Sequence, residues 1–196
     1  MVNFLTFFIL SIFCIVPALQ QNWEQVSRLS WHYGIIAGIF GAIGNGFLVK
    51  ALQRGDLSIL GPINSYKSVV GILIGIIFLH EIPSVWGIVG IVLIIYGSYF
   101  VLDTMKERFS WNLLRNKEIQ YRIGAMILTA IEAVFIKKVI LYSSTTVSFI
   151  FWCWFGAFFS FVLLFFFKIR FAKEMKQVKL HHLPAYGCLV LCIGTM

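Results

Sequence analysis

Two long apolar runs joined by a short polar corner constrain the fold of this chain most strongly. The runs are Ser58–Leu79 and Ser84–Phe100, and the residues between them are His80-Glu81-Ile82-Pro83. Each run falls within the range of ~17–25 residues that a helix needs to cross a bilayer. A corner of this length cannot carry the chain far. The two helices are therefore predicted to lie antiparallel and in contact, as a hairpin within a membrane.

The composition of the chain indicates a lipid bilayer as the surroundings of these helices. Hydrophobic residues make up 60% of the sequence and charged residues 12%, whereas an ordinary soluble domain is ~25% charged. The net charge is +8, and such an excess of positive charge is common in nucleic-acid-binding proteins. Here, however, the basic residues lie between apolar runs and form no continuous face, so no nucleic-acid partner is expected.

Further apolar segments predict an all-α, polytopic membrane helix bundle. The expected spans are Trp31–Ala51, Ile123–Leu141 and Val147–Phe167, in addition to the hairpin. Met1–Leu19 is expected to span as well. A signal peptide is the alternative, because Val16-Pro17-Ala18 resembles a cleavage site, but no Lys or Arg precedes the apolar core. With Pro184–Met196 as the start of another helix, the prediction is six full transmembrane helices and part of a seventh.

The hairpin and its flanks resemble a known transporter family. The helix before it ends in A-L-x-x-G-D-L-S at 51–58, and Gly61-Pro62 begins the next helix. An acidic residue, Glu81, stands at the corner, and the Gly-rich run W-G-I-V-G-I-V-L-I-I-Y-G follows at 86–97. This order is similar to the second half of an EamA repeat of the drug/metabolite transporter superfamily.

A weak internal repeat extends the resemblance. A shift of 153 residues places Tyr33-Gly34 on Tyr186-Gly187 and Gly41 on Gly194. Together with the family resemblance, this register implies helices two to eight of a ten-helix protein built from two inverted five-helix repeats. The expected domains are a first EamA repeat without its first helix (1–103), a basic linker (104–121) and a truncated second repeat (122–196). The sequence is accordingly expected to be an incomplete piece.

The distribution of basic residues predicts the orientation in the membrane. Loops alternate sides, and twelve of the sixteen basic residues fall on one side: Lys50, Arg54, Lys106, Arg108, Arg115, Lys117, Arg122, Lys168, Arg170, Lys173, Lys176 and Lys179. The opposite side receives Arg28, Lys137 and Lys138. The positive-inside rule places the linker in the cytoplasm. The usual arrangement of the resembled family places it outside, and we follow the charge distribution.

Glu132 is the leading candidate for a solute or ion pathway, because it lies near the middle of an expected span. A carboxylate at that depth costs several kcal/mol unless it is paired or hydrated, and such charges usually mark a pathway. Protonated Glu132 would couple transport to protons. Lys67 lies inside another span, beside Asn64 and Tyr66, and these three residues are further pathway candidates. Two alternatives stay open: Glu132 only neutralises Lys67 or Lys137, and Lys67 extends to the interface.

Other polar and sulfur-containing residues are expected to have structural roles. Glu81 is predicted to pin the corner of the hairpin, with gating as the alternative. His181-His182 are expected to be surface residues. The four cysteines all lie in apolar segments and are expected to pack as small apolar side chains: Cys14, Cys153, Cys188 and Cys192. No catalytic set, metal-ligand spacing or phosphate-binding glycine loop is recognisable, so no enzyme activity, metal or cofactor is predicted.

These features predict a secondary transporter that moves a small metabolite across the bacterial cytoplasmic membrane. The resemblance implies a central cavity between the repeats and alternating access around it. The alternative is a membrane protein that does not transport solutes, such as a flippase subunit or an assembly factor. The substrate is not determined by the sequence, because unlike solutes use one scaffold, and a homodimer stays open.

Overall fold

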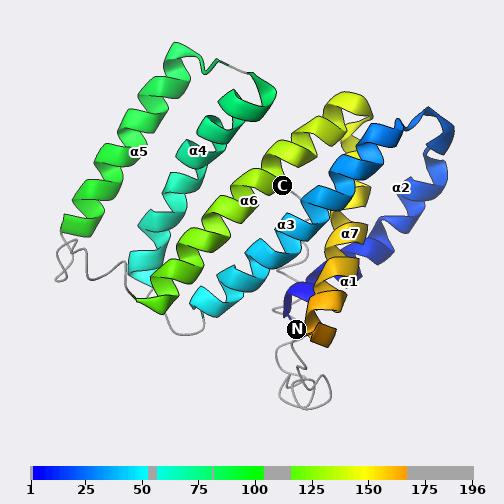
Figure 1. The fold of residues 1–196 in the computed structure, drawn as a ribbon, viewed down its shortest axis with the longest axis horizontal. Coiled ribbons are helices and arrows are strands. Elements are labelled where there is room, and N and C mark those ends of the chain that lie inside the picture. The colour runs from blue at the N-terminus through cyan, green and yellow to red at the C-terminus, as the bar shows by residue number, and fades with distance from the viewer. Residues whose placement is uncertain (1, 53–56, 81, 104–115, 167–196) are drawn as a thin grey trace. The chain divides into compact units, whose positions relative to one another are not determined.

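Helices make up most of the residues that the computed structural model describes, which are residues 2–52, 57–80, 82–103 and 116–166 (Figure 1). Seven α-helices and one short 3₁₀ helix, η1, lie in these ranges, with no strand among them. Their bounds are α1 Val2–Phe13, α2 Ile15–Gln20, η1 Trp23–Gln25, α3 Arg28–Leu52, α4 Leu57–Leu79, α5 Val85–Asp103, α6 Lys117–Tyr142 and α7 Thr145–Phe166. The all-α prediction is confirmed for these residues, and the expected segment Pro184–Met196 lies outside them.

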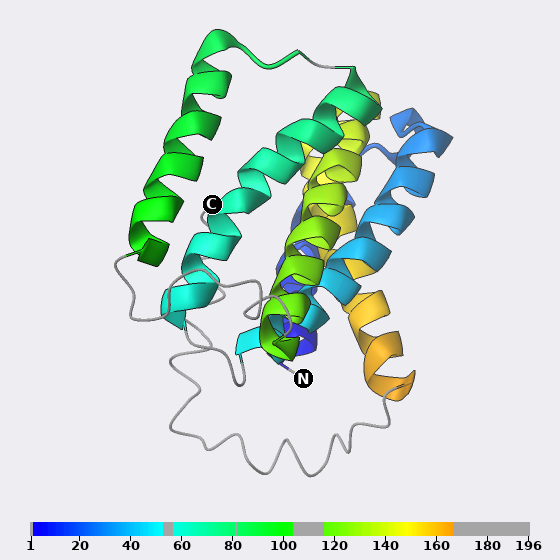
Figure 2. The same ribbon diagram turned by 60° about the vertical axis from the view of Figure 1, so that its left-hand side comes forward.

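The predicted hairpin is formed by α4 and α5, which pack against each other (Figures 1 and 2). Helix α4 ends at Leu79, and His80 adopts a left-handed backbone conformation with φ of 52°. A residue of this conformation commonly terminates a helix, because it turns the chain away from the helix axis. At the other side of the corner, the hydroxyl of Ser84 accepts a hydrogen bond from the backbone N–H of Gly87 at 3.2 Å. Glu81 lies outside the described residues.

The first apolar segment is interrupted, whereas one continuous helix was expected over Met1–Leu19. Helix α1 ends at Phe13 and α2 begins at Ile15. The cause lies four residues beyond the end of α1: Pro17 has no N–H with which to bond the carbonyl of Phe13, and its ring crowds that carbonyl. The neighbouring bonds persist, from Cys14 N–H to the Leu10 carbonyl and from Ala18 N–H to the Cys14 carbonyl, both at 3.0 Å.

Serine side chains begin three of the long helices. Ser27 accepts from the N–H of Leu29 at 3.3 Å, and Ser144 accepts from the N–H of Val147 at 3.2 Å; Ser84 does the same for α5. The first N–H groups of a helix have no partner within it, so such caps satisfy them. The cap at Ser27 also starts α3 before the predicted Trp31.

We expect Ser144→Ala to lower the free energy of unfolding by about 1 kcal/mol, because the first turn of α7 loses its side-chain acceptor. Thermal unfolding of the detergent-solubilised protein measures the effect. Ser143→Ala is the control: Ser143 precedes the cap, and only its backbone N–H is seen bonded, to the carbonyl of Ile140 at 3.4 Å. Equal losses in the two variants would contradict the assigned cap.

Helix α6 begins at Lys117, six residues before the expected Ile123. The acidic side chain of Glu118 lies in its first turn, where its negative charge interacts favourably with the positive end of the helix dipole. Ile119 and Arg122 in this added stretch are 5% and 8% exposed. Polar residues that were predicted to form the linker therefore belong to the start of α6, and one side of this added stretch is buried.

Two helices are long and apolar enough to cross a membrane by the usual measure of length and hydropathy, Arg28–Leu52 and Thr145–Phe165. Three shorter apolar stretches are Asn3–Phe13, Ser65–Leu79 and Val85–Phe100. These numbers apply to the described residues. They agree with a membrane bundle, and the count of six full spans remains a prediction.

Helix α5 exposes large apolar side chains on much of its surface. Val85 is 76% exposed, Trp86 83% and Leu93 64%. A Cβ atom added at Gly90 or Gly97 would meet no described atom within 4 Å. Exposed apolar surface of this kind is rare in water-soluble monomers and is typical of a surface that faces lipid or another helix.

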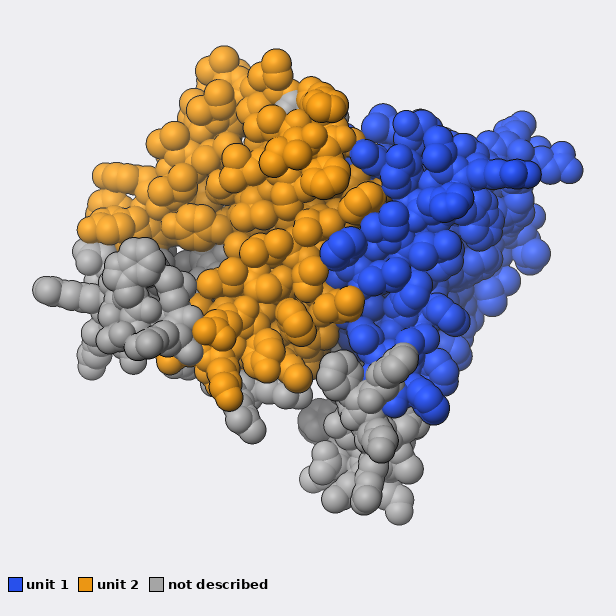
Figure 3. Space-filling model, in the orientation of Figure 1, with its two compact units in different colours: residues 1–42, 136–196 blue, residues 43–135 orange. Residues whose placement is uncertain are grey.

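The chain divides into two compact units, coloured separately in Figure 3. The first contains residues 1–42 and 136–196, and the second contains residues 43–135. Helices α3 and α6 each contribute to both units. The packing is described below for each unit by itself.

In the first unit, α1 packs antiparallel to α7 through a regular series of contacts. The amide of Asn3 donates to the hydroxyl of Ser160 at 3.0 Å. One turn further along α1, a Cβ atom added on Gly156 would lie 2.8 Å from Cδ1 of the Phe7 ring. The hydroxyl of Ser11 donates to the carbonyl of Phe7 at 2.7 Å and lies 3.1 Å from the carbonyl of Cys153. This series of contacts keeps α1 close to α7 along most of the length of α1.

The first unit also packs α3 onto α7 through glycines. A Cβ atom on Gly34 would lie 2.7 Å from Cδ2 of Phe151, and one on Gly38 would lie 2.4 Å from Cβ of Phe155. Small residues at this spacing let helix backbones approach closely, which favours helix association in lipid. In α3, Gly34, Gly38 and, in the second unit, Gly44 lie in such close contact with a neighbouring helix, whereas no described atom lies within 4 Å of a Cβ built on Gly46.

Candidate functional site

The second unit contains a buried row of polar side chains on α6. Arg122, Thr129 and Glu132 are 8%, 9% and 7% exposed. With Ala125, which is 3% exposed, they follow one another at intervals of three, four and three residues. In a helix of ~3.6 residues per turn, this spacing places them on one side. We call Arg122, Ala125, Thr129 and Glu132 the α6 row.

Thr129 is the middle polar member of the α6 row, and its hydroxyl is satisfied within the helix. It donates to the carbonyl of Ala125 at 2.8 Å and lies 3.3 Å from the carbonyl of Met126. Such a bond to the preceding turn allows a hydroxyl to be buried in an apolar helix without an orphaned polar group. The oxygen keeps a free lone pair with which it can accept a further hydrogen bond.

The end of α3 packs beside the α6 row by close backbone approach. A Cβ atom on Gly44 would lie 2.9 Å from Cγ2 of Thr129, and one on Gly124 would lie 3.0 Å from Cδ2 of Phe47. One turn away, the ammonium of Lys50 lies 5.2 Å from the ring centroid of Tyr121. The contacts run in opposite directions along the two helices, so α3 and α6 are antiparallel here.

The two charged members of the α6 row lie far apart along the helix. Ten residues separate Arg122 from Glu132, which corresponds to ~15 Å. The guanidinium therefore lies near the start of α6, and the carboxyl lies well inside it. Burial of a charged group in an apolar bundle costs several kcal/mol unless partners or water compensate, and residues kept there usually serve a pathway.

The predicted pathway residues fall in the same compact unit, 43–135. Glu132 is buried in α6, as expected for a residue at the middle of a span. Tyr66 and Lys67 lie in α4 and are half-buried, and Asn64 lies in the same helix. The predicted pairing of Lys67 with Glu132 stays a prediction. Glu81 and His181-His182 lie outside the described residues.

Sequence reasoning missed Arg122 and Thr129 as members of a buried row. Arg122 was assigned to the polar segment before the helix, and Thr129 was not singled out. The signal was present in the spacing: both residues lie at helical intervals from Glu132. It was obscured because the start of α6 was placed after Arg122 instead of at Lys117.

The described residues hold no group of three or more His, Cys, Asp or Glu side chains that is suited to a metal ion. The polar groups of the α6 row are instead a carboxyl, a hydroxyl and a guanidinium. These side chains carry hydrogen-bond donors and acceptors. The carboxyl is also able to take up and release a proton.

Comparison with known proteins covers the first half of the chain, before the α6 row. The model of the EamA-like transporter family matches residues 1–103, just over half of the chain. "Putative sugar uptake protein SAG2157" of Streptococcus agalactiae serotype V is 29% identical over 94 residues, which is 45% of this chain and 32% of that protein. "Putative sugar uptake protein gbs2116" of serotype III of the same species matches with the same figures.

A third relative is "Uncharacterized protein MJ1333.1" of Methanocaldococcus jannaschii, which is 37% identical over 87 residues, or 44% of this chain and 64% of that protein. The chain thus spans about a third of the length of the two streptococcal relatives. No solved structure matches the chain. The match over 1–103 agrees with the family resemblance of the hairpin, and with the long apolar helices it indicates a membrane protein. The chain belongs to the EamA-like transporter family.

Proposed function

We propose that the protein carrying this chain is a secondary transporter that moves a small polar solute across the bacterial cytoplasmic membrane. The proposed mechanism is alternating access between two inverted repeats, with the solute bound near the membrane midplane. Sugars are the first solute class to test, because two relatives carry sugar uptake in their names. Family membership points to a carrier rather than to an enzyme.

The observation that carries this proposal is the burial of Glu132 on the same side of α6 as Thr129 and Arg122. A helix whose only role is to pack would place apolar side chains on its buried side. Here the buried side presents a carboxyl and a hydroxyl, which are groups that bind sugar hydroxyls through hydrogen bonds. We place the solute against the α6 row, with the proton of Glu132 as the coupling ion.

Helix α4 supplies the second wall of the proposed pathway. Tyr66 and Lys67 are half-buried there, and both side chains donate hydrogen bonds. Asn64 precedes them by less than one turn. The corner residue Glu81 is proposed to pin the end of the α4–α5 hairpin at the membrane interface.

Uptake into sealed vesicles tests the proposal. The gene product carrying this chain is reconstituted with an imposed proton gradient, and uptake of a panel of radiolabelled sugars is followed. We expect at least one sugar to accumulate above the level of protein-free vesicles, and collapse of the gradient to abolish accumulation. Absence of uptake for the whole panel, accompanied by scrambling of fluorescent lipids, would contradict a solute carrier and favour the lipid-flipping alternative.

The orientation follows from the basic residues and gives a separate prediction. In the Arg115→Cys variant, the introduced thiol is expected not to be labelled by a membrane-impermeant maleimide in intact cells and to be labelled after lysis. The reason is that the linker is placed in the cytoplasm. Asn22→Cys, in the exposed loop before α3, serves as the control and is expected to react in intact cells. Ready labelling of Arg115→Cys from outside would reverse the proposed orientation.

A further inference from the structure

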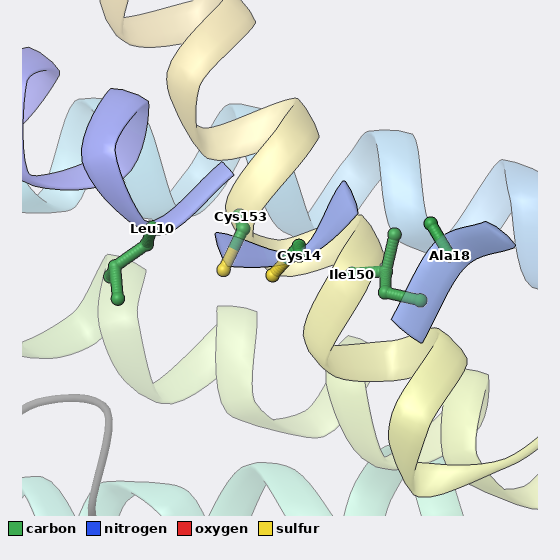
Figure 4. Packing of buried hydrophobic residues seen from close by; sticks show 5 residues of the cluster. All are labelled: Leu10, Cys14, Ala18, Ile150 and Cys153. Atoms are coloured by element: carbon green, nitrogen blue, oxygen red, sulfur yellow. The ribbon is translucent and has the colours of Figure 1, made fainter. Parts of the chain in front are cut away.

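Two cysteines that are 139 positions apart in the sequence meet in the first unit. Cys14 lies at the junction of α1 and α2, and Cys153 lies in α7; they are 1% and 0% exposed. Their side chains belong to one buried cluster. Figure 4 shows the two sulfur atoms adjacent, surrounded by Leu10, Ala18 and Ile150. No disulfide joins the two cysteines in this structure.

The packing around the thiols holds both of them in place. The carbonyl of Cys153 lies 3.1 Å from the hydroxyl of Ser11, which stands one turn before Cys14. Cys14 itself has ordinary helical dihedral angles, with φ of −72° and ψ of −10°. Its backbone is therefore unstrained, and its side chain can adopt a normal rotamer toward α7.

The contact exceeds what apolar packing requires. A small side chain that only filled space would serve equally well as alanine, as Ala18 does in the same cluster, and would place no reactive group against another. The two sulfur atoms lie next to each other (Figure 4), and a disulfide would bring them to ~2.05 Å.

We propose that Cys14 and Cys153 form a redox-sensitive pair whose oxidation to a disulfide joins the α1–α2 junction to α7. Each thiol loses its hydrogen, one S–S bond forms, and two electrons with two protons pass to the oxidant. The oxidant that we assign is a lipid-soluble two-electron acceptor such as a membrane quinone, which is reduced to the quinol. A thiol reductant reverses the reaction.

The disulfide has a consequence for transport that rests on the proposed function. Cys14 belongs to the predicted first repeat, 1–103, and Cys153 to the predicted second repeat, 122–196. A covalent bond between the repeats restrains their relative movement, on which alternating access depends. Oxidation of the pair therefore arrests uptake, and reduction restores it.

Thiol counting tests the disulfide directly. In a Cys188→Ser/Cys192→Ser background, the protein in vesicles is treated with diamide, a membrane-permeant diazene that is reduced to the hydrazine as the disulfide forms. After denaturation, we expect that neither of the two remaining cysteines reacts with maleimide and that the chain runs as a monomer on a non-reducing gel. Dithiothreitol is expected to restore the reaction of both thiols with maleimide. Two thiols that stay reactive, or a cross-linked dimer, would overturn the proposal.

Two further measurements keep the test decisive. The same oxidation of the unmodified chain, followed by proteolysis and mass spectrometry, is expected to yield a peptide that links Cys14 to Cys153; linkage to Cys188 or Cys192 instead would overturn the assignment. Cys14→Ser in the background that lacks Cys188 and Cys192 is the matched control, in which Cys153 stays free after diamide.

Uptake measured on the same vesicles tests the arrest of transport. We expect diamide to lower uptake at least fivefold, dithiothreitol to restore it, and the Cys14→Ser control to be unaffected. Unchanged uptake in protein whose two thiols have been lost would overturn the arrest and leave the disulfide standing. If no solute is transported under any condition, the proposed function fails, and the thiol count still decides whether the disulfide forms.

Discussion

Replacing Glu132 with glutamine is expected to abolish the pH dependence of solute uptake and to slow uptake at the optimal pH by at least about tenfold, which corresponds to ~1.4 kcal/mol in the rate-limiting barrier. Glutamine keeps the size of the side chain and its hydrogen-bonding capacity, but it neither binds nor releases a proton. The wild-type side chain is 7% exposed in α6, where its charge change would couple strongly to a nearby solute. The measurement is uptake into proteoliposomes across a range of pH.

The control for this prediction is Glu118→Gln. It makes the same chemical change in the same helix, at the first turn of α6. There we expect the pH profile to be unchanged, and a loss of only ~0.3–1 kcal/mol of helix stability, because an acidic side chain at a helix start is favourable. Expression and thermal unfolding of both variants show whether they fold. A folded Glu132→Gln variant with the wild-type pH profile would remove Glu132 from the mechanism.

Replacing Gly38 with alanine is expected to destabilise the protein by about 1–3 kcal/mol, the usual cost of adding an atom to a closely packed contact. The new Cβ atom would lie 2.4 Å from Cβ of Phe155 and 3.1 Å from its carbonyl carbon. Both of these atoms belong to or adjoin the backbone of α7, so a change of rotamer cannot relieve the clash. Helices α3 and α7 must move apart, and the close contact along them is lost.

Thermal unfolding in detergent measures this loss, at ~2–4 °C for each kcal/mol in a chain of this size. Gly46→Ala is the matched control, because it makes the same substitution in the same helix with no described atom within 4 Å of the new Cβ. Alanine favours a helix over glycine by ~1 kcal/mol, so we expect the control to be unchanged or more stable. Equal destabilisation of both variants would show that the contact with Phe155 is not the cause.

The hairpin of α4 and α5 was predictable from sequence, because its determinants are local. Apolar runs of sufficient length, a polar corner of four residues and Ser84 at the start of α5 leave few alternatives for the backbone. The interruption at Phe13 had a local cause as well, in Pro17, but the apolar character of the segment concealed it. Helix α6 was placed six residues too late, because its first turns are polar on the exposed side and bury only one side.

The candidate site was predictable only in part. Glu132 is recognisable by itself, because an acidic residue is rare in the middle of an apolar segment. Arg122 and Thr129 join it only once the start of α6 and its buried side are known. A residue of the same type at the interface or on a lipid-facing side would look identical in the sequence.

The sequence by itself determined that this chain forms apolar helices for a membrane and belongs to the EamA-like transporter family. Backbone polar groups in lipid must be satisfied within the helix, so long apolar segments have little choice of structure. Only the tertiary structure decided which glycines lie against a neighbour among the described residues, as Gly38 does and Gly46 does not, and that Cys14 meets Cys153. Such pairings depend on the fit between side chains of helices far apart in the chain, and no local pattern encodes that fit.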